Sequence, residues 1–247
     1  MYRFLTLLII IFSINTSSRS YIDYESPYHP VVGKSGMVVS QNYLSSDIGI
    51  EILNIGGNAV DAAVAVGFSL AITLPRAGNL GGGGFMLVYI KEKNEIFYID
   101  YRSKSPLNSN LENIFNIKDD SGKNYETVPK NFDSKKYDLV DTGYKASAVP
   151  GTVAGLLEAH SRFGKLKLKD ILEPVIKQAK QGIVVSYDLS KAIESTPRLA
   201  NDPESKKIYF DNDTPIQQYS LLKLPDLANT LTLISKHGKD GFYKGET

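Results

Sequence analysis

Apolar residues recur every three to four positions through residues 43–58 and then run almost unbroken through residues 59–73. The first pattern predicts an amphipathic helix that ends at the Gly56-Gly57 pair, because glycine commonly terminates helices. The second pattern predicts a helix with Asn58 as its N-cap and Asp61 in its first turn. Since that helix has almost no polar face, it needs neighbours on nearly all sides, and the chain is predicted to contain a substantial layered core.

The pattern changes from helix to strand after residue 84. Residues 85–91 and 95–101 are two apolar-rich segments separated by a short polar turn, which predicts an antiparallel hairpin. Continuous apolarity in the first segment predicts cover on both faces of that strand. Another short strand is predicted at residues 36–41.

Helical periodicity returns after a long polar stretch from residue 103 to about residue 144, which predicts a surface excursion. Pro150 and Gly164 bracket the next predicted helix. Residues 168–182 and 224–238 predict amphipathic helices closed by glycine, and Ser186 is the expected N-cap of a helix between them. No repeat of fixed period is present.

The composition excludes several classes of function. Lys and Arg total 28 against 27 Asp and Glu, so no excess of positive charge points to a nucleic-acid partner. The chain has no cysteine, which excludes disulfides, thiolate metal sites and cysteine nucleophiles. Its three histidines lie far apart and give little support to a zinc site. No cofactor is expected.

The first 20 residues have the layout of a targeting segment. Arg3 precedes an apolar run from Phe4 to Ile14, and Ser18-Arg19-Ser20 offers a cleavage site. The run is far shorter than the roughly 20 residues that cross a bilayer as a helix. We therefore interpret residues 1–20 as a secretory signal peptide and expect a secreted or periplasmic protein without stable membrane insertion. An uncleaved anchor is the alternative.

Four consecutive glycines, Gly81 to Gly84, lead directly into the first strand of the predicted hairpin. Ordering glycine is entropically costly, so the run indicates backbone that must lie close to something. The spacing fits neither the phosphate-binding P-loop nor the dinucleotide fingerprint, and no Gly-x-Ser-x-Gly motif is present. Two interpretations remain open, namely tight packing between helix and sheet or the wall of an active site.

Arg102 stands where the second strand of the hairpin ends, in the stretch "YIDYRSKSP". A guanidinium can bind a carboxylate through two parallel charge-assisted hydrogen bonds. A solvated surface arginine is the alternative at such a position, and the residue type alone does not decide between them.

Five stretches resemble one known family. They are "GMVVSQNYLSSDIGIEILNIGGNAVDAAVAVGFSLAITLP", "AGNLGGGGFMLVYI", "IDYRSKSP", "VPGTVAGL" and "DGFYKGE", which occur in the family's order across most of residues 36–247. The family is that of the gamma-glutamyltransferases, also called glutathione hydrolases.

The resemblance implies an α+β protein with the four-layer αββα fold of N-terminal-nucleophile hydrolases. It implies cleavage of the gamma-glutamyl amide of glutathione and related compounds, with transfer to water or an amino acid. In that family a precursor cuts itself into a large and a small subunit, and the small subunit's N-terminal threonine is the nucleophile, activated by its own α-amino group. Arg102 matches the family arginine that binds the α-carboxylate of the glutamyl donor, and it is our one candidate substrate-binding residue.

The chain departs from the family pattern at one point. The family's self-processing segment is Thr-Thr-His, and these 247 residues contain no Thr-His pair. We therefore expect residues 21–247 to form a partial large-subunit domain with an incomplete fold, without a catalytic residue of its own and inactive without the small subunit. The resemblance places the glycines at 81–84 in the large subunit, apart from the oxyanion hole.

Two alternatives remain open at the level of sequence. One is a related acylase that acts on amides of dicarboxylic acyl groups, where Arg102 would still bind a carboxylate. The other is a vestigial, non-catalytic fragment.

Overall fold

The structure is a computed structural model that describes residues 31–109 and 146–247. It divides into two units, Met1–Met37 and Val38–Thr247. Residues 31–37 of the first unit contain no helix or strand, and all elements below belong to the second unit. The predicted signal peptide at residues 1–20 and most of the predicted polar excursion lie outside the described residues. None of the described helices has both the length and the apolar character needed to cross a membrane.

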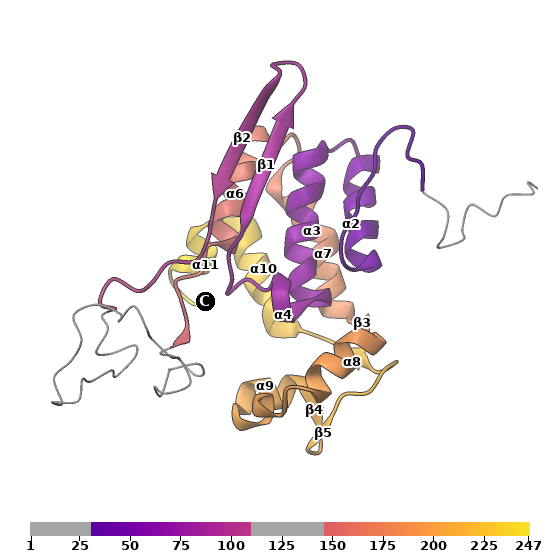
Figure 1. Cartoon of the computed structure of the whole chain (residues 1–247), viewed down its shortest axis with the longest axis vertical. Helices are drawn as coiled ribbons and strands as arrows, with labels where there is room; N and C mark the ends of the chain where they lie inside the picture. Colours follow the sequence, from indigo (N-terminus) through magenta and orange to yellow (C-terminus); the bar gives the residue numbers. More distant parts are fainter. Residues whose placement is uncertain (1–30, 110–145) are drawn as a thin grey trace, which may run out of the picture. The chain divides into compact units, whose positions relative to one another are not determined.

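Helix α3 (Ala59–Thr73) lies at the centre of the core and contacts α2 (Tyr43–Asn54), α6 (Thr152–Phe163) and α7 (Leu168–Gln181), while α7 also packs against α10 (Pro225–His237) (Figure 1). Phe68 and Ile72 of α3 have no exposed surface, and the neighbouring helices contribute fully buried leucines and isoleucines to the same cluster. The predicted burial of residues 59–73 on nearly all sides is confirmed, with Ala59 and Ala63 as the exposed positions.

The ends of these helices follow from their caps. The Asn58 side chain accepts hydrogen bonds from the backbone N–H groups of Val60 and Asp61, while Asp61 accepts one from the Asn58 N–H. This reciprocal capping box satisfies donors that the first helical turn leaves without partners. Gly56 after α2 and Gly182 after α7 adopt positive φ angles of 93° and 89°, as chain reversal there requires. The predicted glycine stops are confirmed.

Strands β1 (Phe85–Ile90) and β2 (Glu95–Asp100) form the predicted antiparallel hairpin, in which Phe85 pairs with Asp100 and Ile90 with Glu95. The prediction that both faces of β1 are covered is wrong for the described residues. Leu87, Tyr89 and Ile96 share one face of the hairpin and are 72%, 58% and 71% exposed. Only the opposite face packs on the helices, where Phe97 of β2 contacts Phe163 of α6.

The strand predicted at residues 36–41 is also wrong, because no described segment pairs with it. A strand needs hydrogen bonds to a neighbouring backbone. This segment leads into α2, and the Ser40 hydroxyl donates a hydrogen bond to the Asn42 carbonyl at the start of that helix, at 2.7 Å.

The remaining elements are short. They include α4 (Pro75–Gly78), α8 (Tyr187–Glu194), η2 (Pro197–Asn201), α9 (Pro203–Tyr209) and α11 (Asp240–Tyr243), together with two-residue strand pairs, β3 (Ile183–Val184) with β6 (Leu221–Leu222) and β4 (Phe210–Asp211) with β5 (Thr214–Pro215). The predicted Ser186 cap of α8 is confirmed, since its hydroxyl accepts from the Leu189 N–H at 3.1 Å.

Candidate functional site

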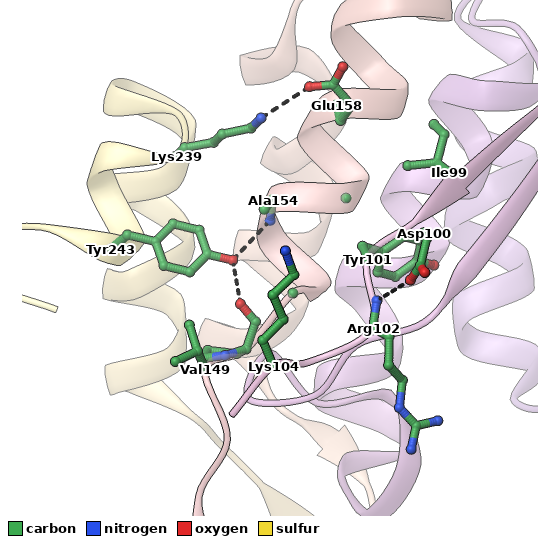
Figure 2. Close-up of a pocket in the computed structure, with 13 residues that line it drawn as sticks. Ile99, Asp100, Tyr101, Arg102, Lys104, Val149, Ala154, Glu158, Lys239 and Tyr243 are labelled. Carbon is green, nitrogen blue, oxygen red and sulfur yellow. Dashed lines mark hydrogen bonds and ion pairs between the residues drawn. The ribbon is translucent and has the colours of Figure 1, made fainter. Parts of the chain in front are cut away.

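Arg102 occupies the loop directly after β2, as the sequence predicts, and its side chain is exposed. Its backbone N–H donates to Oδ1 of Asp100 at 2.9 Å. In Figure 2 its guanidinium extends away from Glu158 and Lys239. Within residues 31–109 and 146–247 this guanidinium makes no ion pair or hydrogen bond. Its donors are therefore free of competition from the described residues.

A cleft of about 380 Å³ adjoins Arg102. It is lined by the end of β2, by Arg102 and Lys104, by residues 149–151, by one face of α6, and by Lys239 and Tyr243 (Figure 2). We call it the Arg102 cleft. Its walls come from three parts of the sequence that are far apart, so the tertiary fold creates it.

The charged side chains of the Arg102 cleft are of both signs. Glu158 of α6 pairs with Lys239 at 3.1 Å, and each side chain keeps close to half of its surface exposed. The opposite charges of Glu158 and Lys239 cancel, whereas Arg102 and Lys104 add positive charge beside Asp100. The arrangement suits a ligand that presents a carboxylate to Arg102.

The glycine run supports the backbone around Arg102. A Cβ atom on Gly83 would lie 2.6 Å from the Tyr101 carbonyl oxygen, and one on Gly84 would lie 2.9 Å from the Tyr101 ring. Tyr101 and Gly84 also exchange backbone hydrogen bonds of 3.0 and 3.3 Å, which extend the hairpin ladder. Gly83 and Gly84 are tightly packed, but against residues 101–103 that follow β2 and not between helix and sheet as one of the two interpretations expected, and this stretch carries Arg102.

The side chain of Tyr101 packs against glycine residues on two sides. Its ring lies between Gly84 and Gly155 of α6, and a Cβ at Gly155 would overlap the Tyr101 side chain. Gly151 likewise allows the Tyr101 carbonyl to approach the start of α6. Burial between these glycines raises the pKa of the Tyr101 phenol, because the charged phenolate loses hydration there. Tyr101 is held on two sides immediately before Arg102.

Two further backbone contacts fix the other walls of the cleft. Lys104 and Val149 form an antiparallel bridge with hydrogen bonds of 3.1 and 2.8 Å. The carbonyl of Gly82 accepts from the N–H groups of Gly151 and Thr152 at 2.8 and 3.2 Å. The chain is thus anchored on both sides of Arg102.

Comparison with known proteins now identifies the family. The family model for gamma-glutamyltranspeptidase matches residues 45–247. The chain belongs to the gamma-glutamyltranspeptidase family.

Individual relatives agree with the assignment. The glutathione hydrolase proenzyme of Escherichia coli strain K12 is 40% identical over 228 residues, which are 92% of this chain and 37% of that protein. The Acylase ACY 1 proenzyme of Pseudomonas sp. strain SE83 is 35% identical over 225 residues, which are 91% of this chain and 39% of that protein. This chain therefore spans a little over a third of the length of these curated relatives.

The crystal structure of Helicobacter pylori gamma-glutamyltranspeptidase has the same fold, with a TM-score of 0.76 at 35% identity over 88% of this chain and 59% of that chain. The α+β fold class of N-terminal-nucleophile hydrolases, predicted from the resemblance, is confirmed. Because 59% of that chain is covered, the matched residues make up only part of the neighbour's fold.

Sequence reasoning placed one residue of this gamma-glutamyltranspeptidase family member at the site, Arg102, and missed its supports. Gly151 and Gly155 are one helical turn apart, and two glycines on one helix face are a signal for a close neighbour. The sequence therefore holds a signal for the contact between α6 and Tyr101. The contact of Tyr243 with the start of α6 has no local signal, because the two lie about 90 residues apart.

Proposed function

We propose that this chain provides the N-terminal portion of the large subunit of a gamma-glutamyl acyltransferase that acts as a glutathione hydrolase. Its substrates are glutathione and other gamma-glutamyl compounds, and the acyl group passes to water or to an amino acid. The observation that carries the proposal is the exposed guanidinium of Arg102 at the rim of a cleft, inside the family stretch "IDYRSKSP".

In this proposal Arg102 binds the α-carboxylate of the glutamyl donor. A carboxylate held by two parallel N–H···O bonds fixes the glutamyl group in orientation as well as in position. Orientation matters because three carbons separate the α-carboxylate from the reacting gamma-glutamyl carbonyl. Arg102 therefore contributes to catalysis by positioning the scissile amide.

The attacking group comes from a small subunit, the partner of this chain. The threonine hydroxyl of that subunit adds to the γ-carbonyl carbon and loses its proton to the threonine's own α-amino group. The amide C–N bond then breaks, the amine leaves with a proton, and water or an amino acid releases the glutamyl group from the threonine ester. No cofactor takes part.

These 247 residues contain no Thr-Thr-His segment, so we propose that the chain is inactive by itself. Loss of one oxyanion donor alone typically slows acyl transfer about 100- to 1000-fold, and here the nucleophile and the oxyanion site both belong to the partner. We further propose that residues 1–20 direct export to the periplasm or the exterior.

The activity is tested with a gamma-glutamyl p-nitroanilide. The purified chain is expected to release no p-nitroaniline above the blank. Coexpression with the rest of the precursor, which supplies the remainder of the large subunit and the small subunit with its Thr-Thr-His segment, is expected to restore turnover. Turnover by the purified chain would contradict the proposed inactivity. A folded complex of both segments that leaves the anilide intact would contradict the proposed reaction.

A second candidate is an acylase that removes dicarboxylic acyl groups from amides. The 35% identity to the Pseudomonas acylase favours it, and Arg102 would then bind the distal carboxylate of the acyl group. Parallel assays of the complex on glutathione and on a glutaryl amide decide between the two. We expect glutathione to be the better substrate by kcat/KM, and a reversed preference would establish the acylase.

A further inference from the structure

The stretch "DGFYKGE" at residues 240–246 has no role in the function proposed above, yet it lies against the Arg102 cleft through Tyr243. The Tyr243 hydroxyl donates to the carbonyl of Pro150 at 2.8 Å and accepts from the N–H of Ala154 at 3.1 Å (Figure 2). One hydroxyl thus serves as both donor and acceptor at the first turn of α6.

That turn lacks a cap of its own. Gly151 occupies the N-cap of α6 and has no side chain to accept from the orphan N–H groups. Helices usually meet this need with a local Ser, Thr, Asp or Asn. Here the Gly82 carbonyl accepts from the Thr152 N–H, while Tyr243, from α11, accepts from the Ala154 N–H and also binds the chain just before the helix.

The Tyr243 hydrogen bonds connect to the Arg102 loop through adjacent backbone. Pro150, whose carbonyl Tyr243 holds, follows Val149, which pairs with Lys104 through hydrogen bonds of 2.8 and 3.1 Å. Lys104 is two residues from Arg102. On the other side of Arg102, Tyr101 packs against Gly155 of the same helix. The loop is thus fixed at both ends to the segment that Tyr243 anchors.

We propose that Tyr243 is a positioning residue for Arg102. Its hydroxyl holds residues 149–155 in place, and these residues hold the backbone at 101 and 104, so that the guanidinium starts from a fixed point. The consequence for donor binding rests on the proposed function of Arg102. The positioning itself concerns only this chain.

Hydrogen exchange on the 247-residue chain tests the positioning. Tyr243→Phe removes the hydroxyl and keeps the ring, which packs edge-on against Phe242 with centroids 4.9 Å apart. We expect the Ala154 amide and the Lys104 amide both to exchange about fivefold faster, the factor that corresponds to the net loss of one hydrogen bond. Tyr219→Phe is the matched control, because Tyr219 is 79% exposed, and it is expected to change neither amide.

Faster exchange confined to Ala154 would overturn the proposal, because Tyr243 would then be a local helix cap only. Unchanged exchange at both amides would overturn it as well.

Steady-state kinetics of the reassembled enzyme, in which this chain is joined by the rest of the large subunit and by the small subunit, separates this inference from the proposed function. Tyr243→Phe is expected to raise KM for the gamma-glutamyl anilide about fivefold while kcat stays within about twofold. Coupled exchange of Ala154 and Lys104 with an unchanged KM would leave the positioning intact and contradict the role given to Arg102.

Discussion

Asp61 illustrates how much one side chain contributes to this fold. It is fully buried, and its carboxylate accepts hydrogen bonds from the backbone N–H groups of Asn58, Lys165 and Leu166 at 3.0 to 3.2 Å. The sequence predicted its place in the first turn of α3. It could not predict Lys165 and Leu166, because these donors lie about 100 residues away in the α6–α7 connection.

Asp61→Asn tests this contribution. An amide keeps one acceptor oxygen but presents an N–H₂ group to backbone donors, so buried donors lose their partners. We expect the free energy of unfolding to fall by about 2–3 kcal/mol. Urea unfolding followed by circular dichroism measures it, with Asp47→Asn on the exposed surface of α2 as the control. Equal midpoints for the two variants would mean that the carboxylate is dispensable.

Whole elements were predictable where their signals are local. The start of α3 follows from the Asn58 cap, and the hairpin follows from two apolar segments around a polar turn. The strands β3 and β6 have two residues each and show no alternation that a sequence pattern could reveal. The apolar run of β1 predicts cover on both faces, yet cover depends on a partner that a local pattern does not specify.

The exposed face of the hairpin leads to a prediction for the isolated chain. Phe85 and Tyr98 stack on this face with centroids 6.1 Å apart, next to Leu87 and Ile96. Exposed apolar strands with open edges promote association. We expect the chain to aggregate as its concentration rises, and Leu87→Lys with Ile96→Lys to increase the soluble fraction several-fold.

Sedimentation of the expressed protein measures the soluble fraction. The control is Ile55→Lys, which changes an isolated isoleucine that is 54% exposed and lies outside the hairpin. An equal gain from this control would show that added charge alone explains the effect and that the hairpin face has no special part in aggregation.

At the scale of the whole molecule, the Arg102 cleft unites segments that are far apart in the chain. Arg102 could be predicted because it lies in a motif, and the motif is local. The packing of Tyr101 against glycines and the Tyr243 contact could not be predicted, because they exist only once α6 and α11 are brought to the end of β2. The sequence does show glycine at positions 83, 84, 151 and 155. The tertiary structure gives the reason, since each of these glycines leaves room for Tyr101.

In the proposed function, this chain binds the donor and a small subunit supplies the attacking hydroxyl. The contribution proposed for the described residues is therefore substrate binding by the guanidinium of Arg102 and the backbone that carries it.

The most direct test of that claim is Arg102→Met in the reassembled enzyme, in which this chain is joined by the rest of the large subunit and by the small subunit. Because two charge-assisted hydrogen bonds are lost, kcat/KM for the gamma-glutamyl anilide is expected to fall about 100-fold or more, mainly through KM. Arg76→Met is the matched control, since Arg76 forms an exposed ion pair with Asp188 and lines no part of the Arg102 cleft, and it is expected to leave the kinetics unchanged. An Arg102→Met complex that binds and processes the anilide as well as the parent would contradict the account.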